Sequence, residues 1–219
     1  MISQDYWDYK LFELDMKILA VGMNYAEHNK ELNHTLLLQD PVIFSKPDSA
    51  LLSKGKPFFI PSFAKRFDHE IEIVVKIKHL GKNISERFAH RYYDEVTIGI
   101  DFTARDLQEQ LTSKGLPWEL CKGFDNSAVI GKFVRKDTLP PIQELHFNLD
   151  IDGQTKQVGY SGNMIHSIDK IIAFASRFFT LKTGDLIFTG TPSGIGPVHE
   201  GQHLEGFLEG NKLLDFNVK

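Results

Sequence analysis

Cysteine is almost absent from this sequence. Cys121 is the single residue of its type among 219, so no disulfide can form within the chain, and zinc sites built from several thiolates are excluded. A chain without disulfides is typical of a reducing compartment. The N-terminal residues also lack the basic and apolar segments of a secretory signal peptide. We therefore expect a cytoplasmic protein.

Long hydrophobic runs and an excess of basic charge are missing as well. No apolar run approaches the ~18 residues that a membrane-spanning helix needs. The 25 basic and 29 acidic side chains are interspersed and give a net charge of −4, so no basic surface for nucleic acid is predicted. The composition is that of a globular protein. We expect one domain spanning residues 1–219, with residues 1–16 as an N-terminal extension.

Residues 68–77 alternate polar and apolar side chains, which predicts a half-buried β-strand. Glu70 and Glu72 share one face, whereas the other face, which points toward the core, carries Ile71, Ile73, Val75 and Ile77. Their Cα atoms would lie about 7 Å apart, so both carboxylates can reach one hard cation. Considered alone, this pair is more often a solvent-exposed acidic face.

A second strand, predicted at residues 96–100, runs directly into Asp101. Residues 103–106 resemble a capping box, which predicts a helix from there to about Leu111. Arg105 and Gln108 share one face of that helix because they are three residues apart. Asp101 would lie at the end of the strand. Considered alone, an aspartate in this position is more often part of a simple turn between strand and helix than of a functional site.

His28 and Glu31 lie three residues apart in a predicted turn and short polar helix over residues 22–32. On a helix they share a face and can touch. A carboxylate beside an imidazole holds its tautomer and raises its basicity, as a general base requires. An ordinary exposed helical turn is the alternative.

Lys122 lies between small and apolar neighbours, after a predicted loop at residues 115–118. Such a lysine either has a lowered pKa or is a positive anchor for a bound acid, and an ordinary surface lysine is the alternative. The adjacent Cys121 is predicted to be a small buried side chain rather than a nucleophile, because no base is paired with it.

Other segments complete the predicted fold. An apolar stripe predicts a core helix over residues 167–179, and Asp152-Gly153 predicts a hairpin turn. Residues 201–219 are predicted to form a small β-meander. The glycine-rich loop 190–197 has hydroxyls and amides that can hold a carboxylate or phosphate, but it matches neither a P-loop nor a Rossmann fingerprint.

The carboxylates favour a hard metal ion. His69-Glu70 does not begin an H-E-x-x-H zinc motif, because apolar residues occupy the position of the second histidine. Three carboxylates without a histidine in the pattern favour Mg²⁺, or Mn²⁺ in its place.

Six motifs occur in an order and spacing typical of one family. They are Gly22-x-Asn24-Tyr25-x-x-His28-x-x-Glu31, Phe44-x-Lys46-Pro47, His69-Glu70-x-Glu72, Asp101-x-Thr103-x-Arg105-Asp106-x-Gln108, Lys122-x-Phe124-Asp125 and Gly184-Asp185-x-Ile187-x-Thr189-Gly190-Thr191-Pro192-x-Gly194. On these motifs, which span most of residues 17–198, the chain resembles the fumarylacetoacetate hydrolase family. It is most similar to the short branch of acylpyruvate hydrolases and oxaloacetate decarboxylases, which includes fumarylpyruvate hydrolase-like members.

The resemblance implies a fold and a set of site residues. The implied fold is of the α+β class and mainly β, a mixed β-sandwich roll with few short helices, usually in a homodimer. The implied ligands of Mg²⁺ are Glu70, Glu72 and Asp101. The implied catalytic residues are His28 and Glu31, on a lid segment, and Lys122. The implied substrate-binding residues are Lys46, Arg105, Gln108, Thr189, Gly190 and Thr191.

The resemblance also implies a reaction. We expect Mg²⁺-dependent hydrolysis of the C–C bond of acylpyruvates to pyruvate and a carboxylic acid, with oxaloacetate decarboxylation as a second activity. The alternatives are isomerisation or dehydration of another 2-oxo acid, or a non-catalytic protein that binds a ligand through a metal. Met23 stands where many relatives carry arginine, which leaves the preferred acid open.

Overall fold

The computed structural model describes residues 16–32 and 39–219. The predicted N-terminal extension therefore lies outside the described residues, except for Met16. None of the helices in the described part of the chain is long and apolar enough to cross a membrane. The fold is mainly β with few short helices, as predicted.

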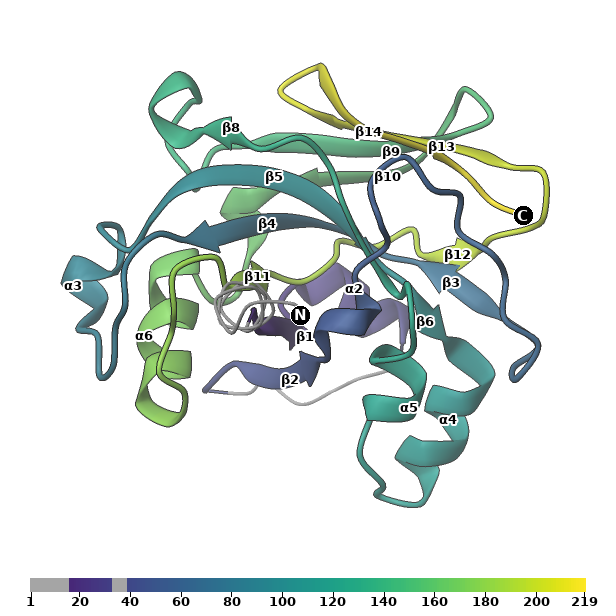
Figure 1. The fold of residues 1–219 in the computed structure, drawn as a ribbon, viewed down its shortest axis with the longest axis horizontal. Coiled ribbons are helices and arrows are strands. Elements are labelled where there is room, and N and C mark those ends of the chain that lie inside the picture. The colour runs from purple at the N-terminus through teal and green to yellow at the C-terminus, as the bar shows by residue number, and fades with distance from the viewer. Residues whose placement is uncertain (1–15, 33–38) are drawn as a thin grey trace, which may run out of the picture.

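A mixed sheet runs through the centre of the molecule (Figure 1). Its strands follow the order β2-β1-β11-β4-β5-β7, and β8 also pairs with β5. β1 and β11 pair in parallel, and the other neighbours are antiparallel. The bounds are β1 Ile18–Gly22, β2 Val42–Lys46, β4 Ile71–Ile77, β5 Tyr93–Asp101, β7 Ala128–Ile130, β8 Val134–Arg135 and β11 Leu186–Phe188.

Two smaller sheets and short helices surround this sheet. A four-stranded antiparallel sheet, β10-β9-β13-β14, contacts β5, and a three-stranded sheet has the order β12-β3-β6. The strand bounds are β3 Phe67–His69, β6 Thr103–Ala104, β9 His146–Ile151, β10 Gln154–Tyr160, β12 Gly196–Pro197, β13 His203–Leu208 and β14 Asn211–Asn217. The helices are α2 Ala26–Glu31, α3 Glu86–Ala89, α4 Arg105–Ser113, α5 Glu119–Lys122 and α6 Ile168–Phe178, with 3₁₀ turns at Asp48–Ala50, Lys136–Thr138 and Ser161–Asn163.

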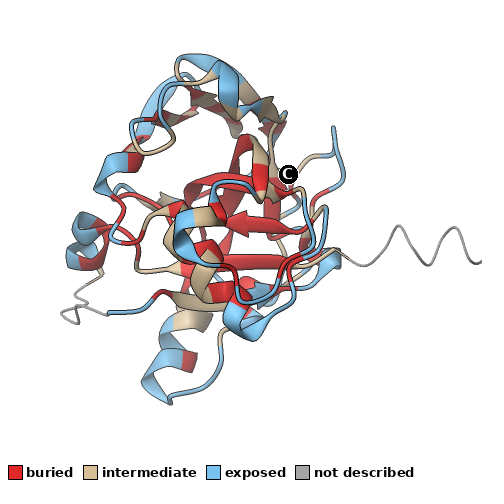
Figure 2. Cartoon of the chain, turned by 90° about the vertical axis from the view of Figure 1, so that its left-hand side faces the viewer, coloured by how far each residue is buried: buried red, intermediate tan, exposed pale blue. Residues whose placement is uncertain are grey.

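The strand predicted at residues 68–77 is buried on both faces, not on one. Figure 2 shows that the buried residues gather in the strands at the centre of the molecule. Ile71 and Ile73 belong to the main hydrophobic core, whereas Val74 on the opposite face packs in a second cluster with Phe188. The expectation of a half-buried strand is wrong because a hydrophobic cluster packs against each face of β4, which lies between β11 and β5 in the central sheet. Glu72 is consequently inside the protein, with 1% of its surface exposed.

The predicted strand is also divided in two at Glu70. β3 pairs with β6 and β12, whereas β4 pairs with β5 and β11, so the chain changes sheets at this residue. The carbonyl of Glu70 accepts a hydrogen bond of 2.8 Å from the amide of Asp101. Alternation of side chains cannot reveal such a change, because it persists through both short strands.

The helix α4 begins without the predicted capping box. Thr103 belongs to β6, and its hydroxyl donates to Glu70 Oε1 at 2.9 Å instead of capping the helix. The helix ends at Ser113, beyond the predicted Leu111. Lys122 lies at the end of the short helix α5 and is buried, so the alternative of an ordinary surface lysine is wrong.

The helix α6 and the hairpin at Asp152-Gly153 are confirmed. Ser167 caps α6 by accepting a hydrogen bond from the amide of Lys170. The aliphatic part of the predicted stripe is buried, whereas Phe178 and Phe179 at its C-terminal end are exposed, so the stripe is shorter than predicted. Asp152 and Gly153 both have positive φ, at 52° and 73°, between β9 and β10. Such a turn matches the twist of the paired strands.

Candidate active site

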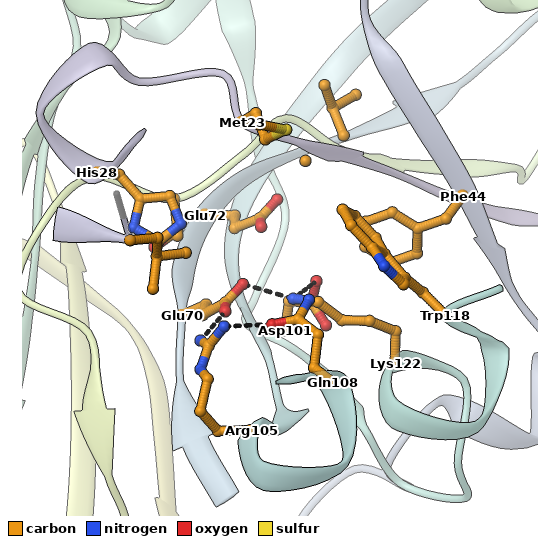
Figure 3. A pocket seen from close by; sticks show the side chains of 14 residues that line it. Met23, His28, Phe44, Glu70, Glu72, Asp101, Arg105, Gln108, Trp118 and Lys122 are labelled. Carbon is orange, nitrogen blue, oxygen red and sulfur yellow. Dashed lines mark hydrogen bonds and ion pairs between the residues drawn. The ribbon is translucent and has the colours of Figure 1, made fainter. Parts of the chain in front are cut away.

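Three acidic side chains converge between the ends of β4 and β5 (Figure 3). One oxygen each from Glu70, Glu72 and Asp101 lies within 4.8 Å of the other two. The antiparallel register pairs Ile71 with Ile100. Asp101 therefore lies beside Glu70, where β5 ends and β4 begins. All three side chains are buried, so the alternative of a solvent-exposed acidic face is wrong.

The charges of this cluster suit a hard divalent cation. Burial raises the pKa of Glu72, and the charges of Asp101 and Glu70 raise it further. Asp101 Oδ1 is buried and lies 2.6 Å from Lys46 Nζ in an ion pair, without an aligned hydrogen bond. Mutually repelling carboxylates with a free lone pair are typical ligands of Mg²⁺ or Mn²⁺. The residues therefore fit such an ion.

A second acidic group, His203, Glu205 and Asp215, fits a metal less well. It lies at the surface, on β13 and β14. Lys212 Nζ already pairs with both carboxylates, at 2.9 Å from Glu205 and 2.6 Å from Asp215. Both carboxylates of this surface group are therefore neutralised, whereas Glu72 of the buried cluster has no ion pair with a lysine or arginine among the described residues.

Lys122 is an anchored charge beside the acidic cluster. Its Nζ donates to Glu70 Oε2 at 2.6 Å and to Asp101 Oδ2 at 3.0 Å. Burial by itself lowers the pKa of Lys122, but Asp101 and Glu70 outweigh burial, so the pKa is raised. Of the two sequence-based alternatives, the structure thus favours a positive anchor over a lysine of lowered pKa.

Arg105 and Gln108 lie on the same face of α4 and both line the cavity. Arg105 Nε donates to Asp68 Oδ2 at 2.8 Å, and Nη2 donates to Glu70 Oε1 at 2.5 Å. The remaining Nη1 donates to Gln108 Oε1. The guanidinium therefore fixes Glu70 from one side while Lys122 holds it from the other.

His28 enters the cavity from α2, facing the carboxylates (Figure 3). Its Nδ1 lies 3.4 Å from Glu31 Oε2, and Gly194 N donates to Glu31 Oε1 at 3.3 Å. Burial lowers the pKa of His28 below its ordinary value of 6.5, although Glu70 and Glu31 oppose the shift. The imidazole is therefore neutral at neutral pH and can accept a proton.

The loop after β11 carries three of the predicted substrate-binding residues, and only one of them lines the cavity. Thr191 lines the cavity, whereas Thr189 donates through its hydroxyl to the carbonyl of Ile73 at 2.8 Å. Gly190 N donates to Glu72 Oε2 at 2.7 Å. Gly190 has φ of 98°, and a Cβ there would lie 2.7 Å from Asn24 Cβ, so this contact requires glycine.

Lys46 contacts the acidic cluster rather than the open cavity. It ends β2, is buried, and is not one of the residues that line the cavity. Its Nζ contacts Asp101 Oδ1, donates to Ser127 Oγ at 3.0 Å, and donates to the carbonyl of Lys122. The position suits fixing Asp101 more than binding a substrate directly.

Gln157 is a site residue that sequence reasoning missed. Its Oε1 accepts from Ile71 N at 3.0 Å and from His69 Nδ1 at 2.9 Å. Its Nε2 donates to Thr191 Oγ1 and to the carbonyl of Pro192, each at 3.0 Å. A β-bulge in β10 places this residue, and the sequence carries no signal for the bulge.

We expect Gln157→Ala to destabilise the protein by about 1–3 kcal/mol, because it leaves Ile71 N and His69 without a buried partner. Chemical denaturation with a fitted slope would measure the loss. The control is Gln154→Ala, which removes an exposed glutamine from the same strand and should change the unfolding free energy little. Equal losses for the two variants would contradict the bridging role.

Comparison with known proteins identifies similar chains over nearly the whole length. Residues 17–216 match the family model described as fumarylacetoacetate (FAA) hydrolase C-terminal. The mitochondrial oxaloacetate tautomerase of Mus musculus is 39% identical over 210 residues, covering 96% of this chain and 95% of that protein. The mitochondrial oxaloacetate decarboxylase of Dictyostelium discoideum is 38% identical over 202 residues, covering 92% of each.

A solved structure supports the same relationship. The fumarylpyruvate hydrolase from Pseudomonas aeruginosa, in complex with Mn²⁺ and pyruvate, matches with a TM-score of 0.86 and 32% identity. The match covers 92% of this chain and 88% of that one. The likeness therefore extends from sequence to fold.

Proposed function

Because the chain belongs to the fumarylacetoacetate hydrolase family, we propose that it hydrolyses the C–C bond of acylpyruvates with the help of Mg²⁺. The products would be pyruvate and a carboxylic acid. One observation carries the proposal: a single cavity is lined by three buried carboxylates, a charged lysine and a neutral histidine paired with a carboxylate. The complex of the Pseudomonas relative with Mn²⁺ and pyruvate supports it.

Glu70, Glu72 and Asp101 would hold the metal. When bound, a divalent ion supplies a Lewis acid that polarises the 2-oxo group of the substrate. Arg105 and Lys122 keep Glu70 ionised: burial alone would raise its pKa, but the two cations hold that pKa below its usual range. Glu70 is thereby ready to act as a ligand at neutral pH.

His28 would act as the general base. Glu31 accepts from Nδ1, which leaves Nε2 to take a proton from water. The hydroxyl of that water adds to the acyl carbonyl, and the C–C bond breaks with its electron pair remaining on the pyruvyl carbon. The proton held by His28 then passes to that carbon, which balances the reaction.

Lys122 would stabilise the charge that develops on the pyruvyl part. Its ammonium is held at Glu70 and Asp101 and also lies 5.4 Å from the centre of the Phe44 ring. A fixed donor in a buried site needs no reorganisation during the reaction, which makes it effective.

Oxaloacetate is the second candidate substrate, because the relatives from Mus musculus and Dictyostelium are named for its tautomerisation and decarboxylation. Loss of CO₂ needs no attacking water, so decarboxylation would need only the Lewis acid that the carboxylates would hold, with Lys122 beside it. Tautomerisation moves one proton, for which His28 is placed.

We expect acetylpyruvate to release pyruvate in the presence of Mg²⁺, to lose this reaction after chelation with EDTA, and to regain it with Mg²⁺ or Mn²⁺. A coupled lactate dehydrogenase assay would measure pyruvate, and absorbance of the enol would follow the substrate. Consumption of a 2-oxo acid without pyruvate would favour an isomerase or dehydratase. Binding of metal and substrate without any turnover would favour the non-catalytic alternative.

The proposal also covers the domain content, the oligomeric state and the cellular location of the protein. Residues 1–219 would form one catalytic domain with residues 1–16 as an extension, and two chains would form a homodimer, which light scattering would test. A cytoplasmic location rests on the single cysteine, whereas the name of the mouse relative places that protein in mitochondria. Cell fractionation would distinguish the two compartments.

A further inference from the structure

The cavity above the carboxylates has two chemically different sides (Figure 3). Charged and polar side chains occupy one side. The other is an apolar wall made by Met23, Phe44 and Trp118. Resting on the proposed acylpyruvate hydrolysis, we propose that the acyl group accepted here is short and uncharged, and that the apolar wall rejects an acyl group ending in a carboxylate.

The apolar wall is held in place by specific contacts. Phe44 and Trp118 pack edge to face, with ring centres 5.8 Å apart and an interplanar angle of 69°. A Cβ on Gly22 would lie 3.1 Å from the Trp118 ring, so the absence of a side chain there lets the ring approach β1. Met23 has φ of 63°, and Asn29 Nδ2 donates to its carbonyl at 3.0 Å.

The cations of the cavity already have partners. Lys122 is bonded to Glu70 and Asp101, and Arg105 is bonded to Asp68 and Glu70. No further lysine or arginine is found among the described residues that line the cavity. A carboxylate at the far end of an acyl group would therefore be buried without a counter-charge, which is strongly unfavourable.

The available space limits the acyl group as well. The centre of a water molecule can occupy about 30 Å³ of the cavity. This is room for about two or three waters. Behind Met23 lies a smaller cavity, whose lining includes Asn29, Ile165 and His166. Gly22 and Met23 line both cavities, so Met23 is the side chain between them, and we infer that it limits the length of the acyl group.

Oxaloacetate does not conflict with this assignment. Its second carboxylate takes the place of the acyl carbonyl itself, next to the reacting carbon. The group that the apolar wall would receive begins one carbon farther along an acylpyruvate.

The test compares two 2-oxo acids that differ only at the far end, 2-oxohexanoate and 2-oxoadipate, by titration calorimetry in saturating Mg²⁺. Neither has a second ketone, so binding is read without turnover. We expect the wild type to bind 2-oxohexanoate about tenfold or more tightly, because the other acid buries an unpaired charge. Met23→Lys supplies a counter-charge and should remove or reverse the preference.

The control is Ala26→Lys, which adds the same charge at an exposed position of α2 outside the cavity. It should keep the wild-type preference. Equal or tighter binding of 2-oxoadipate by the wild type would overturn the inference, as would equal effects of the two lysine variants.

The same experiment separates this inference from the proposed function. Retention of the binding preference while butanoylpyruvate is not cleaved would support the apolar wall and reject the hydrolase. Cleavage of butanoylpyruvate and succinylpyruvate at equal kcat/KM, with no binding preference, would reject the apolar wall and support the hydrolase.

Discussion

Glu72→Gln is expected to reduce metal-dependent turnover severely while leaving the metal-free protein at least as stable as the wild type. Burial, Asp101 and Glu70 all raise the pKa of Glu72, so its ionised form is unfavourable without a cation. Glutamine keeps the size and an acceptor for the amide of Gly190 but removes this charge. We expect kcat/KM for acetylpyruvate to fall about 10²–10³-fold.

The raised pKa of Glu72 predicts how the stability of the metal-free protein changes with pH. A carboxyl whose pKa is raised on folding contributes stability that is present below its unfolded value and is lost as pH rises through the folded pKa. The metal-free wild type should therefore lose stability as pH rises above about 4.5, the ordinary value for glutamate. Glu72→Gln should reduce this slope, and saturating Mg²⁺ should reduce it in the wild type.

Metal titration by calorimetry, together with thermal unfolding with and without Mg²⁺, would measure both effects. Glu205→Gln is the control, because it removes a carboxylate from the exposed cluster that Lys212 already neutralises. It should leave metal affinity unchanged. A Glu72→Gln variant that binds Mg²⁺ like the wild type would contradict the assignment of this residue as a ligand.

His28→Ala should separate the two candidate reactions. We expect hydrolysis of acetylpyruvate to fall about 10²–10⁴-fold, since water then lacks a positioned base. Decarboxylation of oxaloacetate should fall much less, because that reaction needs no activated water. Parallel assays of pyruvate release from both substrates would show the difference, with the exposed His199→Ala as the control.

The pH profile offers a second view of His28. Burial lowers its pKa below 6.5, and a general base is active when it is unprotonated. The rate of hydrolysis should therefore stay constant as the pH is lowered to about 6.5. It should decline only at lower pH, where the imidazole becomes protonated. If the rates of hydrolysis and decarboxylation fell together at low pH, His28 would not be a base for hydrolysis alone. Equal losses of the two activities in His28→Ala would contradict the prediction in the same way.

Much of the fold could be predicted from local pattern. The helix α6 was recognisable because its apolar residues recur at helical spacing and Ser167 can cap it. The hairpin at Asp152-Gly153 was recognisable because these residues adopt positive φ readily. The break at Glu70 and the short strand β6 were not, because both depend on pairing with segments distant in the sequence.

The sequence by itself determined which side chains could form a site: two glutamates one residue apart, a strand-end aspartate, a histidine three residues from a glutamate, and a lysine. The tertiary structure decided their environment. Packing on both faces of the central sheet buries the carboxylates, Lys46 lies against Asp101, and the bulge in β10 brings Gln157 to the loop at Thr191. Burial and charge pairing arise between segments far apart in the chain, so no local pattern could specify them.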